Sequence, residues 1–129
     1  MEFPEDLRYT KSHEWVRLSG DKAVCGITDF AQHELSDVVY VELPDIGSEV
    51  TAGEQCAVVE SVKIAADVYA PLSGKVTEIN TSLDGAPETV NADPYSTGWF
   101  FEIELSDPSE VDGLMDADAY QAHTEAEKH

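Results

Sequence analysis

Residues 58–68 read VVESVKIAADV and join two apolar segments through a short polar turn. The flanking segments, 55–62 and 66–70, are rich in β-branched and small apolar residues, which is typical of strands. The sequence therefore predicts a hairpin that holds Lys63 out from the body of the protein. A lysine in that position can be acylated, and an amide-linked cofactor there gains a long flexible stem. On spacing alone, an ordinary surface lysine in a turn is the commoner explanation.

Several other segments also predict short strands. Residues 14–18 and 22–27 flank Ser19-Gly20-Asp21, a hairpin signal, and residues 37–43 form a β-branched run that ends at Pro44. Two further strands are predicted at 75–79 and 99–105, and in the second of these one face is apolar: Trp99, Phe101, Ile103 and Leu105. Short strands with Gly and Pro turns favour a mainly β fold, a sandwich or a barrel of antiparallel sheets.

The predicted helices are short and peripheral. Thr28 can cap a helix over residues 29–35. A second helix is predicted after Asp107, with Pro108 at its first position and Glu110 completing a capping box. One apolar stripe is expected on it: Val111, Leu114 and Met115.

The end of the chain is expected to hold one more short helix. Asp116 can cap it, and it is expected to run through Tyr120. Residues 121–129 are polar and are expected to be frayed.

Length and charge limit the function. The 129 residues suit a single domain over 1–129, and no apolar run approaches the roughly 20 residues of a membrane span. The net charge of −20 argues against nucleic acid or an anionic membrane as partner, but it permits docking onto basic protein surfaces. Residues 1–6 do not read as a targeting segment, which predicts a cytoplasmic protein of a prokaryote. Cys25 and Cys56 lie in apolar stretches and are expected to be buried free thiols.

No motif predicts an enzyme. The adjacent pairs His13-Glu14 and His33-Glu34 lack metal-ligand spacing, so no metal site is predicted. His123 and His129 lie in the polar tail and are expected to face solvent. The sequence has no nucleophile elbow and no glycine-rich phosphate loop.

Several separated motifs stand along the chain: Tyr9, Ser12 to Val16, Val24 to Asp29 with Ala31-Gln32, Asp37 to Val39 with Val41 to Pro44, Val59 to Lys63 with Ala66-Asp67, Ala70-Pro71 with Ser73-Gly74, and Val90-Asn91 with Asp93 to Tyr95 and Gly98-Trp99. In this order and at this spacing they resemble the glycine cleavage H protein family, from about Leu7 to Tyr120. Lys63 falls on the family's lipoylated position.

The resemblance implies a carrier without catalytic residues, bearing lipoate on Lys63. In the family, the P protein (glycine decarboxylase) loads an aminomethyl group onto the arm. The T protein (aminomethyltransferase) unloads it, and the L protein (dihydrolipoyl dehydrogenase) reoxidises the arm. The family fold is a lipoyl-type flattened β-barrel of two antiparallel sheets with added helices. Here the lipoyl core would span about 22–105 and the C-terminal helical segment about 107–122, in a monomer.

The resemblance also places residues around the arm. Ser12, Glu14 and Asp67 match positions that line a cleft where the loaded arm folds back, and carboxylates there would pair with the aminomethyl cation. Glu60 is expected to serve recognition by the lipoate-attaching enzyme. The sequence departs from the family at Phe30, where His is common, and at Glu34. His33 is one position away from Glu34, and whether either residue replaces the cleft histidine is left open.

Three alternative functions compete with this one. Another swinging-arm carrier is disfavoured because biotinyl domains place Met on both sides of the lysine, whereas Val62 and Ile64 stand here. Lipoyl domains of 2-oxoacid dehydrogenases favour Asp before the lysine and lack the 91–99 segment. An H-like protein that relays lipoyl groups to other enzymes would use the same lysine. A small acidic enzyme would need a nucleophile or metal site, which the motifs do not provide.

Overall fold

The hairpin around Lys63 forms as predicted, within a three-stranded antiparallel sheet ordered β4-β6-β7. The computed structural model describes residues 1–127. The strands are β4 (Val38–Glu42), β6 (Gln55–Ser61) and β7 (Ala65–Tyr69). Ala57 and Val59 of β6 are buried, because alternate residues of a strand face the core.

The second sheet has six strands in the order β1-β2-β3-β9-β8-β5. Its strands are β1 (Arg8–Tyr9), β2 (Glu14–Ser19), β3 (Lys22–Ile27), β5 (Glu49–Val50), β8 (Gly74–Ile79) and β9 (Phe101–Leu105). The predicted turn joins β2 to β3, and Gly20 has the positive φ of 63° that such turns favour. The two-residue strands β1 and β5 were not predicted, because their extended conformation depends on pairing with β2 and β8 and not on a pattern in their own sequence.

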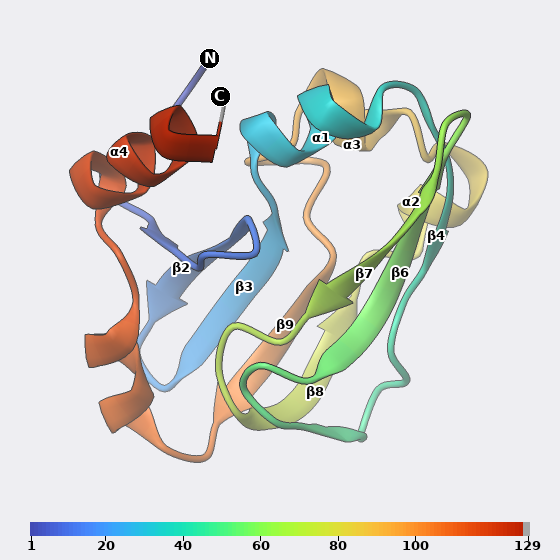
Figure 1. Cartoon of the computed structure of the whole chain (residues 1–129). Helices are drawn as coiled ribbons and strands as arrows, with labels where there is room; N and C mark the ends of the chain where they lie inside the picture. Colours follow the sequence, from blue (N-terminus) through green and yellow to red (C-terminus); the bar gives the residue numbers. More distant parts are fainter. Residues whose placement is uncertain (128–129) are drawn as a thin grey trace.

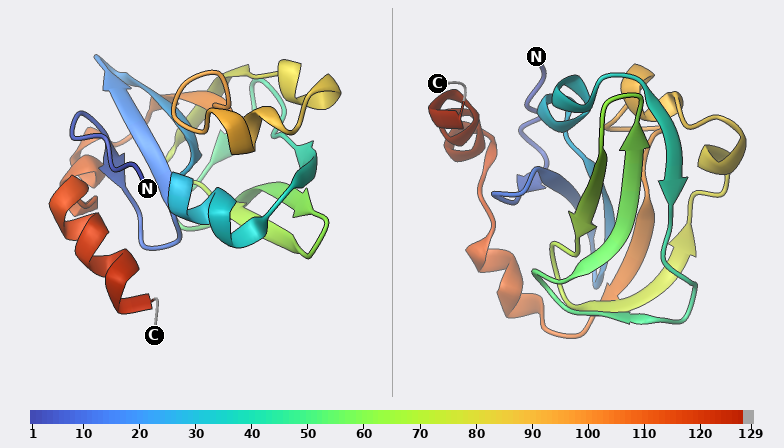
Figure 2. Two further views of the ribbon diagram at one scale, coloured as in Figure 1. Left: turned by 90° about the horizontal axis from the view of Figure 1, so that it is seen from above. Right: turned by 45° about the vertical axis from the view of Figure 1, so that its right-hand side comes forward.

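The two sheets face each other as a flattened sandwich and do not close into a strict barrel (Figures 1 and 2). Apolar side chains from both sheets form the core, among them Val16, Phe101 and Ile103 from one and Val41 and Val59 from the other. This confirms the mainly β fold. The thiols are free as predicted, Cys25 in the core and Cys56 half-buried, and burial raises the pKa of Cys56 to about 12.

Short helices lie at one end of the sandwich. Helix α1 (Asp29–Leu35) begins where predicted, and the Thr28 hydroxyl accepts a hydrogen bond from the Ala31 N–H. The single-turn helices α2 (Ser82–Gly85) and α3 (Thr89–Ala92) were not predicted, because four residues carry too little periodicity.

The predicted helix after Asp107 is a 3₁₀-helix, η1 (Pro108–Gly113). Asp107 caps it, but the predicted capping box is wrong: the Glu110 carboxylate accepts hydrogen bonds from the N–H and hydroxyl of Ser73. The single helical stripe is also wrong, since η1 ends at Gly113 and the backbone of Met115 pairs with Tyr9.

Helix α4 (Ala117–Glu127) is longer than predicted. Asp116 accepts from the Ala119 N–H as expected, but the helix continues past Tyr120, so the expectation of a frayed segment is wrong for 121–127. Tertiary contacts stabilise the longer helix: Tyr120 is fully buried and stacks on Tyr9, with ring centroids 4.5 Å apart. Residues 128–129 lie outside the described part. None of the helices within 1–127 has the length and apolarity needed to cross a bilayer.

Candidate functional site

Lys63 sits exposed at the tip of the β6–β7 hairpin, and Ser61 orders the backbone around it. The Ser61 hydroxyl accepts hydrogen bonds from the N–H groups of Lys63 and Ile64, both 3.1 Å away. The Ser61 N–H donates to the Ile64 carbonyl at 2.8 Å, which closes the turn. Sequence reasoning missed this role, although a serine two residues before a turn lysine is a recognised local capping pattern.

A second set of hydrogen bonds fixes the hairpin tip to the rest of the protein. The Val62 N–H donates to the Asp37 carbonyl at 3.0 Å. Next to it, the Val38 N–H donates to the Asn91 side-chain oxygen at 2.8 Å, and the Asn91 amide donates to the Ser36 carbonyl. Asn91 on α3 thus positions the segment that holds the lysine tip. This support was not predicted, since it joins residues more than 50 positions apart.

A pocket of about 480 Å³ lies beside the hairpin, between β7, helix α1 and the start of β2. It brings together the three residues expected at an arm cleft: Ser12, Glu14 and Asp67. Ile64, next to Lys63, also lines it, and the Lys63 amine lies 3.2 Å from the backbone carbonyl oxygen of Glu34, another lining residue. The lysine amine therefore stands at the rim of the pocket.

Glu14 is the most unusual group in this pocket, because its carboxylate is buried without a cation. The residue is 1% exposed, and none of the ion pairs within residues 1–127 involves it. Its Oε1 accepts from the hydroxyls of Thr10 and Ser12, each at 2.6 Å, and its Oε2 accepts from the Tyr69 N–H at 3.3 Å. Burial raises the pKa of Glu14, and these hydrogen bonds oppose the rise.

The remaining lining combines buried apolar side chains with exposed acidic ones. Buried Ile27, Phe30 and Val68 contribute the apolar part. Among residues 1–127, no lysine or arginine lines the pocket, whereas exposed Glu34 and Asp67 do. Such a lining suits a chain with an apolar stem and a cationic end.

Glu60 and His33 lie elsewhere. Glu60 is half-buried on β6, where its neighbours Ala57 and Val59 alternate into the core, and neither Glu60 nor His33 lines the pocket. A histidine does line it, but from another element: His13, whose ring centroid lies 4.8 Å from that of Phe30.

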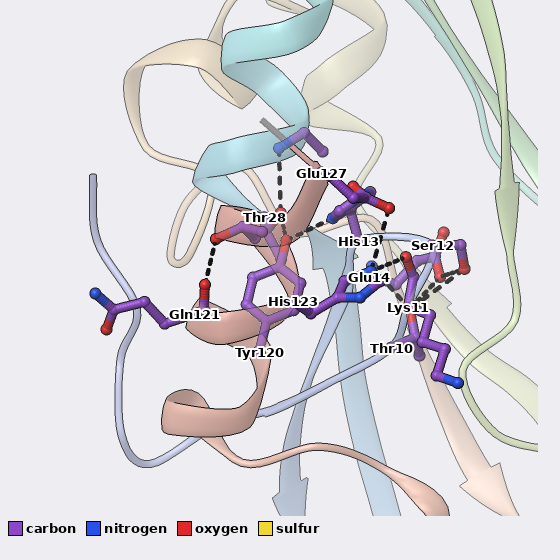
Figure 3. Close-up of polar contacts among 12 residues, drawn as sticks. Thr10, Lys11, Ser12, His13, Glu14, Thr28, Tyr120, Gln121, His123 and Glu127 are labelled. Carbon is purple, nitrogen blue, oxygen red and sulfur yellow. Dashed lines mark hydrogen bonds and ion pairs between the residues drawn. The ribbon is translucent and has the colours of Figure 1, made fainter. Parts of the chain in front are cut away.

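His13 belongs to a cluster that the sequence did not predict. The Nε2 atom of His13 lies 2.7 Å from one carboxylate oxygen of Glu127, and Nε2 of His123 lies 3.2 Å from the other (Figure 3). The expectation that His123 faces solvent is therefore wrong, and His129 lies outside the described residues. Burial lowers the pKa of His13 despite the nearby Glu127 carboxylate.

The sandwich carries an exposed lysine on a hydrogen-bonded hairpin, beside a pocket lined by apolar and acidic side chains. This arrangement is that of a carrier of the swinging-arm class. The profile of the family described as "Glycine cleavage H-protein" matches residues 7–127. The chain is 57% identical to the glycine cleavage system H protein of Anaeromyxobacter sp. (strain K), over 99% of this chain and all of that protein. It is also 57% identical to a probable glycine cleavage system H protein of Haloarcula marismortui, over 95% and 96%.

A solved structure agrees. The crystal structure of a glycine cleavage system H protein from Mycobacterium marinum superposes with a TM-score of 0.87 at 38% identity, covering 94% of this chain and 98% of that one. The chain therefore belongs to the glycine cleavage H-protein family, the lipoyl carriers of glycine cleavage.

Proposed function

We propose that Lys63 bears lipoate in amide linkage and that the chain carries the aminomethyl group of glycine from the P protein to the T protein, the L protein reoxidising the arm. The observation that carries this proposal is the exposed Lys63 amine at the rim of a pocket that buries the Glu14 carboxylate. The chain itself acts as a carrier and not as an enzyme.

The residues around the pocket fit such an arm. The bound lipoyl group would supply a disulfide that takes up the cargo and an apolar stem that joins it to Lys63. Ile27, Phe30 and Val68 offer this stem an apolar surface. The hydrogen bonds of Ser61 and Asp37 hold the attachment point still, so that the arm's motion comes from its own rotatable bonds.

Glu14 would hold the cationic amine of the cargo. Two hydroxyls and one backbone N–H already fix its carboxylate, yet Oε2 accepts one hydrogen bond and has capacity for another. A charge-assisted hydrogen bond to an amine is strong in a site shielded from water. Ser12 orients Glu14, and exposed Asp67 would add a weaker, solvent-screened attraction.

The surface around Lys63 fits docking by larger partners. Four exposed apolar side chains lie on or beside the tip of the small sheet: Val39, Tyr40, Val62 and Ile64. Exposed apolar patches of this kind mark protein interaction sites. We assign this surface, with Glu60, to the lipoate-attaching enzyme and the partner proteins.

The wider setting is proposed on the same grounds. The chain would act as a monomer, a single carrier domain over 1–129, in the cytoplasm of a prokaryote, since the relatives named above are bacterial and archaeal.

The attachment site has a direct test. The chain is expressed with a lipoate-attaching enzyme and lipoate, and its intact mass and peptide map are measured. We expect one lipoyl adduct on the wild type, none on Lys63→Ala, and an undiminished adduct on the control Lys75→Ala, whose lysine lies on β8. An adduct that persists on Lys63→Ala would overturn the assignment.

A further inference from the structure

Three side chains that are far apart in the sequence converge at the end of the pocket. His13 comes from the turn before β2 with a positive φ of 74°, while His123 and Glu127 lie one turn apart on α4. One potential ligand atom from each lies within 4.8 Å of the other two. The close-up shows both imidazoles directed at the Glu127 carboxylate (Figure 3).

These groups have the chemistry of a transition-metal site. Two imidazole nitrogens and one carboxylate oxygen are a donor set that zinc takes, with bonds of about 2.0–2.2 Å. In a tetrahedral site such bonds place the ligand atoms roughly 3.3 Å apart. The two nitrogen–oxygen distances, 2.7 Å for His13 and 3.2 Å for His123, run to different oxygens of the Glu127 carboxylate. A small rotation of that carboxylate, with the shorter contact opening by about 0.6 Å, would bring the three groups to the separation of a zinc site.

The surroundings of His13 also suit a histidine that coordinates a metal ion. Its Nδ1 lies 2.8 Å from the Tyr120 hydroxyl, which lies 2.6 Å from the Thr28 hydroxyl. Metal-bound histidines usually have the second ring nitrogen held in this way, which fixes the ring and the tautomer. Because hydroxyl hydrogens rotate, Nδ1 can donate to Tyr120 and leave the Nε2 lone pair for a metal, which would replace the direct contact between Nε2 and Glu127.

A fourth ligand is close. The backbone carbonyl oxygen of Lys11 lies 3.0 Å from Nε2 of His123, on the same side as the cluster. That oxygen or a water would complete four-coordination. The net charge of −20 favours accumulation of divalent cations near the surface.

We propose that His13, His123 and Glu127 bind one zinc-class divalent cation. The ion would clamp α4 onto the turn that precedes β2. Since His13 and Glu127 both line the pocket described above, it would also brace that end of the pocket and neutralise one of its rim carboxylates. None of the proposed ligands is Lys63, so zinc binding can be tested on the chain without lipoate.

The test is calorimetric titration of the tag-free, chelator-treated full chain with zinc sulfate, with magnesium as the comparison ion. We expect one zinc per chain and no comparable binding of magnesium, which prefers oxygen ligands. With zinc at about 100 times its Kd, the melting temperature should rise by roughly 5–15 °C.

Variants locate the ion. His123→Ala and Glu127→Gln should each weaken zinc binding at least tenfold, whereas His33→Ala and Glu125→Gln should leave it unchanged, since neither His33 nor Glu125 belongs to the cluster. Glu127 is exposed at the end of α4, so its variant keeps the test valid if His123→Ala fails to fold. Absence of zinc binding by the wild type overturns the proposal, as does zinc binding that both cluster variants retain at wild-type strength.

Discussion

Replacing Glu14 with glutamine should shorten the lifetime of the cargo on the arm far more than the same change at Asp67. Glu14→Gln preserves shape, and its side-chain oxygen can still accept from Thr10 and Ser12. It removes the charge that would meet the cationic amine. Hydrogen bonds to charged groups contribute about 1.5–3 kcal/mol, which corresponds to roughly 10- to 140-fold in rate. This free energy is not reduced for screening by solvent, because Glu14 is only 1% exposed.

Asp67 lies on the exposed rim, so its expected contribution is smaller. Exposed charge pairs are screened by water, and Asp67→Asn should speed cargo loss by less than about fivefold. The two variants therefore form a matched pair in which a buried and an exposed carboxylate of one pocket lose their charge.

The assay follows retention of the aminomethyl group. Lipoylated wild type and variants are loaded with labelled glycine by the P protein, separated from it, and followed by intact mass at pH 7.5. Loss from Glu14→Gln at the wild-type rate would refute the role of the buried carboxylate. An Asp67→Asn effect equal to or larger than that of Glu14→Gln would refute the argument from burial.

Three further outcomes test other parts of the argument. The lipoylated chain with glycine and pyridoxal phosphate should release no carbon dioxide until the P protein is added; release without that protein would contradict a carrier. Gly26→Ala should lower the free energy of unfolding by about 1–3 kcal/mol, because a Cβ there would lie 2.8 Å from the Trp15 indole. Urea unfolding measures this, with Gly85→Ala as the unobstructed control. Burial raises the pKa of Glu14 in the folded state, so the wild type should gain stability relative to Glu14→Gln as the pH falls from 7 towards 4.5, and a loss would contradict it.

The sequence predicted the longer strands because their periodicity is local. The hairpin at Gly20, the helix capped by Thr28 and the alternating face of β9 were all readable from neighbouring residues. Elements fixed by distant partners were not. Helix α4 continues past Tyr120 because that residue packs on Tyr9. The Glu110 carboxylate accepts a hydrogen bond from Ser73 instead of capping its own helix.

The candidate site divides in the same way. A family motif marks Lys63, and the resemblance named three pocket residues that the fold brings together. Nothing in the local sequence indicates that His13 meets His123 across 110 positions, or that Asn91 supports the segment behind the hairpin tip. Contacts between distant residues depend on how sheets and helices pack, which pattern reading cannot supply.

The support of Glu14 links the C-terminal helix to the pocket. Glu14 is held by hydroxyls of Thr10 and Ser12, on the turn that also carries His13. That turn is fixed from outside: the His13 ring contacts the hydroxyl of Tyr120, and the Lys11 carbonyl contacts His123. Helix α4 therefore helps to position the two hydroxyls that donate hydrogen bonds to the buried Glu14 carboxylate. These hydrogen bonds stabilise the carboxylate in the absence of a neighbouring cation. Because the carboxylate has no ion pair within 1–127, a cationic cargo can bind it without displacing a lysine or arginine.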